Sequence, residues 1–183
     1  EENFTVEIIN FLIKIVSLFS IAPVIIIMLR LTREETRSRI EQVYSRSVSR
    51  KTYVISHLFI AIITSIIMQL SIVIGLYIGG KETLDEVMPF TSLLKLGLVY
   101  LPSIWIIVSL TMVLMGYMPN KVNLIWGYFA FMFLDLYLSG LLKIPDFISK
   151  LSVFDYIPKI PAENVNILTI SILIVVGIML FIF

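Results

Sequence analysis

The chain has 183 residues, of which 58% are hydrophobic and only 15% are charged, and its formal net charge is +1. A soluble domain usually carries about 25% charged residues, so this composition excludes a soluble enzyme and a disordered tail. The chain contains no cysteine, which excludes a disulfide scaffold, a thiolate metal site and a cysteine nucleophile. At roughly 20 apolar residues per bilayer crossing, we expect an integral membrane protein with about five spans.

Five apolar runs are each long enough to cross a bilayer, and they predict an all-α polytopic membrane bundle. The runs cover residues 8–31, 53–78, 93–115, 122–140 and 167–183. We interpret the whole chain, residues 1–183, as a single transmembrane domain. The connecting segments are a loop at residues 32–52 and a longer amphipathic segment at residues 141–166.

The distribution of basic residues predicts the orientation of the spans. Seven of the 14 basic residues lie between Arg30 and Lys51. By the positive-inside rule, loop 32–52 is therefore cytoplasmic in a bacterial cell membrane. Alternation then puts the N-terminus and residues 79–91 outside, and an outside start leads us to expect a further span before residue 1.

The first apolar run contains Lys14, and the fourth contains Asp135. Charges inside a span are costly and usually face protein or water. Both residues lie about one and a half turns from the predicted outer ends of their spans. Two interpretations stay open: each side chain reaches the outer interface separately, or Lys14 and Asp135 form an ion pair inside the bundle.

The basic loop has helical patterning. Thr32 and Glu35 match a capping box, which predicts a helix that begins at Thr32. Glu35 and Arg39 are spaced to form a favourable i,i+4 pair. Two interpretations follow from the residues alone: a solvated loop that only sets the topology, or a short amphipathic helix that docks on a cytoplasmic partner.

The second apolar run ends with Gly75 and Gly79, four residues apart, a spacing that allows another helix to approach closely. The run Gly75 to Gly80-Lys81 also begins like a phosphate-binding loop. Position 82 is a glutamate, however, where Ser or Thr is needed to hold magnesium. We therefore expect no nucleotide site here.

The outer segment 141–166 has apolar residues at helical spacing and Pro145 at a position that suits a first helical turn. It predicts a helix that lies at, or re-enters, the outer interface. The chain also lacks the signatures of intramembrane hydrolases and zinc enzymes. We expect neither catalytic residues, a metal site nor a bound cofactor.

Several motifs in this order resemble the type-2 ATP-binding-cassette (ABC) export permeases. The motifs are Arg33-Glu34-Glu35 with Ser38, Arg39 and Glu41; Ser47-Val48-Ser49-Arg50; Tyr100-Leu101-Pro102; Gly116-Tyr117-Met118-Pro119; Trp126-Gly127; and the segment from Leu151 to Pro161. The sequence departs from the family's pattern with Ser38 for glycine and with Ser47 and Val153 for prolines. These departures change local turn geometry and leave the resemblance intact.

The resemblance implies one half of an antibiotic-exporter-like permease, without its first span. Loop 32–52 would be the coupling helix that docks on an ATPase subunit, and that subunit would bind ATP and magnesium. The docking residues would be Arg33, Glu34, Glu35, Arg37, Arg39, Glu41, Tyr44, Arg46 and Arg50.

The expected partners are that ATPase, a second permease half or a second copy, and the lipid bilayer, without nucleic acid. The expected function is outward transport of a hydrophobic or amphipathic substrate. The alternative is a membrane sensor or assembly scaffold that recruits a cytoplasmic partner through its basic loop.

Overall fold

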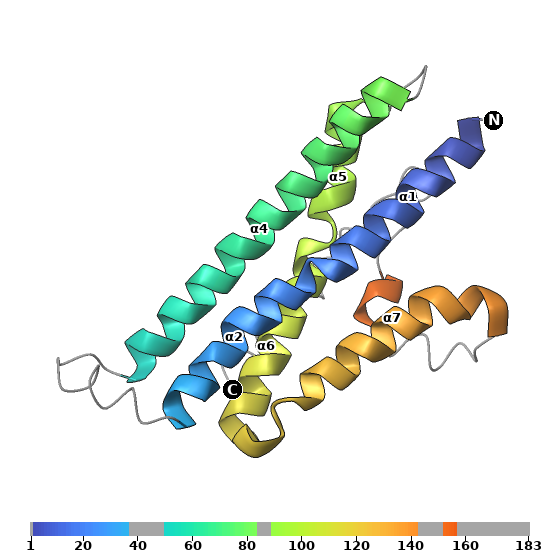
Figure 1. Ribbon diagram of the computed structural model, residues 1–183. Coiled ribbons are helices and arrows are strands. Elements are labelled where there is room, and N and C mark those ends of the chain that lie inside the picture. The colour runs from blue at the N-terminus through green and yellow to red at the C-terminus, as the bar shows by residue number, and fades with distance from the viewer. Residues whose placement is uncertain (1, 37–49, 84–88, 143–151, 157–183) are drawn as a thin grey trace.

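A computed structural model describes residues 2–36, 50–83, 89–142 and 152–156, and every regular element in these ranges is helical. The elements are α1 (Glu2–Phe19), α2 (Ile21–Thr36), α4 (Arg50–Thr83), α5 (Phe90–Leu98), α6 (Leu101–Tyr117), the 3₁₀ turn η1 (Pro119–Lys121), α7 (Leu124–Leu142) and the 3₁₀ turn η2 (Val153–Tyr156). They form an elongated bundle (Figure 1). The predicted fold class, an all-α membrane bundle, is confirmed.

Three helical stretches are long and apolar enough to cross a membrane: Ile8–Leu31, Thr52–Glu82 and Phe90–Tyr117. A shorter apolar helix covers Leu124–Tyr137. These stretches lie over the first four predicted spans. The fifth predicted span, residues 167–183, lies outside the described residues.

Two of these stretches are interrupted near their middles, and a proline explains each interruption. A proline inside a helix lacks an N–H, and its ring clashes with the carbonyl group four residues earlier. Pro23 is four residues after Phe19, where α1 ends, and Pro102 is four residues after Leu98, where α5 ends. The sequence pattern predicts one span in each place, and the structure divides each into two helices.

The unbroken helix α4 contacts the helices on both sides of each interruption, because it packs against α1, α2, α5 and α6. It lies close to α5 at Gly97. A Cβ atom added at Gly97 would collide with the Val73 Cγ2 atom of α4. Because Gly97 has no side chain, the backbone of α5 can lie directly against the Val73 side chain of α4.

One expectation about the basic loop is wrong. The capping box predicts a helix that begins at Thr32, whereas α2 continues through this residue to Thr36. No helix-breaking residue separates Leu31 from Thr36, and Arg and Glu are good helix formers, so the helix of the first span simply extends. The next described helix, α4, begins at Arg50.

Most of the predicted outer helix in segment 141–166 lies outside the described residues. The described parts are residues 141–142, which end α7, and residues 152–156, which contain the 3₁₀ turn η2. Phe154 in this turn is buried, and its ring lies 5.4 Å from that of Tyr100. Phe154 therefore packs into the bundle, against one of the two residues that separate α5 from α6.

Candidate functional site

A cluster of buried polar side chains holds the interruption between α1 and α2 against the middle of α4. Ser17 Oγ donates a hydrogen bond to Gln69 Oε1 at 3.1 Å, and Gln69 Nε2 donates to Ser20 Oγ at 3.3 Å. Ser20 Oγ donates in turn to the Ser17 carbonyl oxygen at 2.7 Å. Ser17 and Gln69 are fully buried and Ser20 nearly so. One amide side chain on α4 thus bonds both to the last turn of α1 and to Ser20, the residue that separates α1 from α2.

A second polar contact lies one helical turn from Gln69, on the same helix. The Trp105 indole N–H on α6 donates to Ser65 Oγ at 3.1 Å, and Ser65 Oγ donates to the Ile62 carbonyl oxygen at 2.7 Å. Interhelical hydrogen bonds of this kind contribute about 0.6 kcal/mol each in a membrane protein. The buried polar groups of α4 therefore attach both kinked spans to it.

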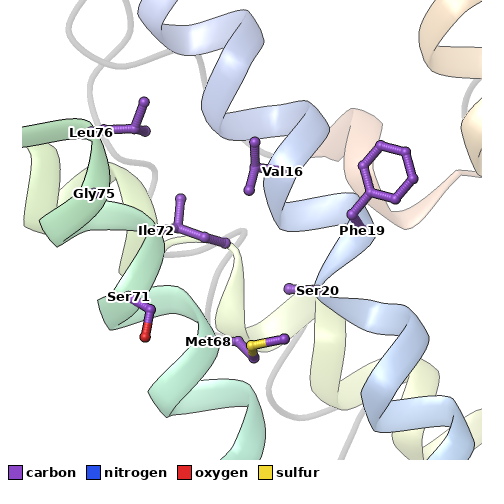
Figure 2. Close-up of a pocket in the computed structure, with 8 residues that line it drawn as sticks. All are labelled: Val16, Phe19, Ser20, Met68, Ser71, Ile72, Gly75 and Leu76. Atoms are coloured by element: carbon purple, nitrogen blue, oxygen red, sulfur yellow. The ribbon is translucent and has the colours of Figure 1, made fainter. Parts of the chain in front are cut away.

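A groove opens beside the buried cluster, between the last turn of α1 and the second half of α4 (Figure 2). It encloses about 470 Å³, and Val16, Phe19, Ser20, Met68, Ser71, Ile72, Gly75 and Leu76 line it. Figure 2 shows Met68 and Ile72 extending from α4 towards α1, with the Phe19 ring pointing away from α4 at the rim. None of the lining residues carries a charge.

The predicted docking residues are only partly described. Arg33, Glu34 and Glu35 lie in the last turns of α2, and Arg50 is the first residue of α4. The C-terminal end of α2 and the N-terminal end of α4 lie at the same end of the bundle (Figure 1). The remaining docking residues, which are Arg37, Arg39, Glu41, Tyr44 and Arg46, lie outside the described residues. Their docking role stays a prediction.

The predicted charge pair lies on two helices that pack together in opposite directions (Figure 1). The rings of Phe11 and Tyr137 lie 6.4 Å apart, and those of Phe19 and Phe133 lie 5.5 Å apart. This register places position 14 of α1 at about the level of Asp135 on α7. Asp135 is 8% exposed, and its Oδ1 atom accepts no hydrogen bond from the described residues. The pairing with Lys14 stays a prediction.

The predicted helix-packing pair, Gly75 and Gly79, lies on an exposed part of α4. A Cβ atom added at either glycine would meet no atom within 4 Å among the described residues. The glycine that the described helices use for close packing is Gly97. The role of Gly75 and Gly79 in packing another helix stays a prediction.

Sequence reasoning missed Gln69, Ser17, Ser20 and Gly97. Gln69 carried a usable signal, because a lone amide in the middle of an apolar run usually faces the protein interior. The serines carried none, since serine hydroxyls often bond to their own helix backbone in apolar helices. Among the described residues, no group of three His, Asp or Glu side chains is placed to hold a metal ion.

Comparisons with known proteins place the chain among efflux permeases. The whole chain, residues 1–183, matches the family model described as the C-terminal domain of the multidrug efflux system permease Rv1217c. A relative, the multidrug efflux system permease protein Rv1217c of Mycobacterium tuberculosis (strain ATCC 25618 / H37Rv), is 30% identical over 134 residues. The match covers 72% of this chain and 24% of the relative, so the matched part spans about a quarter of that protein's length.

Proposed function

This chain belongs to the family of the C-terminal domain of the multidrug efflux system permease Rv1217c, and on that premise we propose that it forms one membrane half of an ATP-driven exporter. The family match confirms the resemblance to ABC export permeases. The match over all 183 residues is the single observation that carries the proposal.

The structure supports the proposal through the surface of the bundle. Large apolar side chains are exposed along the length of α4; they include Ile55, Phe59, Ile67, Ile74 and Ile78. Soluble monomers rarely expose a contiguous apolar surface of this kind, whereas a membrane-spanning helix presents one to lipid. The chain is a membrane protein, and we place its α2–α4 end in the cytoplasm of a bacterial cell.

In the proposed mechanism, a separate ATPase subunit binds ATP and magnesium and docks on residues 33–50. Closure of two ATPase subunits moves the docking segment, and α2 transmits that movement directly because Arg33, Glu34 and Glu35 are part of it. The spans then reorient and release a hydrophobic or amphipathic substrate outward. Two permease halves, in one chain or as two copies, line the pathway.

Reconstitution tests the proposal. The full-length protein and its ATPase partner are placed in proteoliposomes, and the ATP-dependent movement of a lipophilic dye across the bilayer is measured. We expect movement that stops when the ATPase carries a substitution of its phosphate-binding lysine. A protein that copurifies with no ATPase and moves no dye would instead fit the sensor or scaffold alternative.

Docking is tested separately with Tyr44→Asp. An aromatic anchor in an interface usually carries a large share of the binding energy, while charges at the rim carry less. We therefore expect Tyr44→Asp to reduce ATPase copurification and transport while the protein stays in the membrane. Ser45→Asp, which adds the same charge at the next position, is the matched control and should have a smaller effect. Full association of Tyr44→Asp with the ATPase would refute the docking role.

A further inference from the structure

We propose that the groove between α1 and α4 binds the transported substrate, and that this substrate is an uncharged amphipathic molecule with a hydrogen-bond donor on an apolar body. The inference rests on the proposed export function, and it adds a binding site and a substrate class to it. Three features of the groove carry it: its size, its lack of charge and the hydrogen bonds that its two hydroxyl groups already make.

The size of the groove fits a small organic molecule. Ligand pockets usually enclose about 300–1,000 Å³, and this groove encloses about 470 Å³. It is open on one side, since Val16 is 39% exposed and Phe19 is 51% exposed. Its walls belong to two of the apolar membrane-spanning stretches, so in the proposed arrangement a molecule dissolved in the bilayer enters the groove from its open side.

The lining of the groove disfavours a charged ligand. Six of its eight residues have no polar side-chain group, and the other two are Ser20 and Ser71. An ionised group placed there would lose its hydration without meeting an opposite charge, which is strongly unfavourable. Gln69, the buried side chain that bonds to Ser20, is a neutral amide whose oxygen already accepts from Ser17.

The two hydroxyl groups determine which polar group the ligand must bring. Ser20 Oγ uses its proton to bond the Ser17 carbonyl oxygen, and Ser71 Oγ uses its proton to bond the Ile67 carbonyl oxygen at 2.8 Å. A hydroxyl group has one donor and two acceptor sites. Ser20 Oγ keeps one acceptor site because it already accepts from Gln69 Nε2, and Ser71 Oγ keeps at least one. The groove therefore offers acceptors, and the complementary ligand group is a donor such as a hydroxyl or an amide N–H.

Photolabelling of the full-length protein with its ATPase in proteoliposomes tests the site. The probes are para-hydroxymethyl benzophenone, its methyl ether, which lacks the donor, and its trimethylammonium analogue, which is charged. We expect the hydroxymethyl probe to label α4 around Met68 and Ile72, the methyl ether to label about fivefold less, and the charged probe to label least. Equal labelling by the three probes would overturn the proposed substrate class.

Two variants and one control locate the labelling. Gly75→Leu puts a side chain into the open groove, where no described atom within 4 Å obstructs it, and should abolish labelling at Met68. Ser71→Ala removes one of the two acceptors, so labelling by the hydroxymethyl probe should fall towards that of its methyl ether, whose own labelling should stay unchanged. Gly127→Leu, at another unobstructed glycine outside the groove, should label like the wild type. Unchanged labelling in Gly75→Leu would overturn the site.

Transport of the hydroxymethyl probe separates this inference from the proposed function. If Gly75→Leu loses both labelling and ATP-dependent export of the probe, the groove is part of the transport route. If Gly75→Leu loses labelling but exports the probe normally, the inference fails while the export function stands. If the wild-type protein exports nothing, the proposed function itself fails.

Discussion

The close approach of α5 to α4 makes Gly97→Ala an informative substitution. The added Cβ atom would collide with Val73 Cγ2, and a valine in a helix has one strongly preferred rotamer, so this methyl group cannot easily turn away. Overpacking of this kind costs about 1–3 kcal/mol. Alanine in place of glycine regains about 0.5–1 kcal/mol of helix propensity. We therefore expect Gly97→Ala to lower the free energy of unfolding by about 1–2 kcal/mol.

The collision predicts a specific rescue by Val73→Ala. The other atoms near the added Cβ are Val73 Cβ at 3.8 Å and the Gln69 carbonyl oxygen at 3.7 Å, and both are ordinary contacts. Once Val73 is alanine, the Gly97→Ala change should become neutral or stabilising by up to about 1 kcal/mol. The expected coupling energy between the two substitutions is therefore about 2 kcal/mol.

The assay is denaturation in mixed micelles, followed by tryptophan fluorescence, for the wild type, the two single variants and the double variant. Gly127→Ala is the control, because its added Cβ would meet nothing within 4 Å, and it should be neutral or slightly stabilising. Equal destabilisation by Gly97→Ala in both backgrounds would refute the collision argument. So would a Gly97→Ala protein that is as stable as the Gly127→Ala control.

Three further predictions follow from the buried polar groups and the topology. Gln69→Leu removes two hydrogen bonds of α4 and should lower the free energy of unfolding by about 1 kcal/mol in the same denaturation assay. An unchanged free energy of unfolding would show that these bonds contribute nothing. Asp135→Asn should destabilise the protein more in the wild-type background than together with Lys14→Met, and additive effects would reject the ion pair. Single cysteines at Ser45 and Thr83 should react with an impermeant thiol reagent from opposite sides of the membrane, the first only from the cytoplasm; labelling of both from one side would reject the five-span topology.

The sequence predicts the existence of the described membrane helices well, because length and hydropathy decide whether a segment can cross a bilayer. The sequence also contains the information needed to locate the two interruptions, because Pro23 and Pro102 each end a helix at the residue four positions earlier. It could not predict which side of each helix faces its neighbours. In a soluble protein the polar face of a helix marks the side that is exposed to water. A membrane helix is apolar towards both lipid and protein, so its sequence does not mark the packed side.

The candidate site shows the same limit. Gly75 and Gly79 have the spacing of a packing motif, yet the described helices pack closely at Gly97, which has no partner glycine four residues away. The helix start predicted from the capping box at Thr32 is wrong, because α2 already runs through this position and contains no helix-breaking residue there. The groove required the structure, because its two walls are about 50 residues apart in the chain.

The two proline interruptions have a mechanical consequence. On one side of them α1 packs with α5, on the other α2 packs with α6, and α4 contacts all four of these helices. Pro23 cannot donate to the Phe19 carbonyl oxygen, nor Pro102 to that of Leu98, so bending at these points breaks neither of those backbone bonds. If the chain bends at Ser20, the end of α2 that moves farthest is the one that carries Arg33–Glu35, because the 16 residues of this helix are about 24 Å long. A rotation of α2 by about 10° about Ser20 moves that end by about 4 Å. Ser20 also lines the groove, so the groove lies at the point about which α2 rotates.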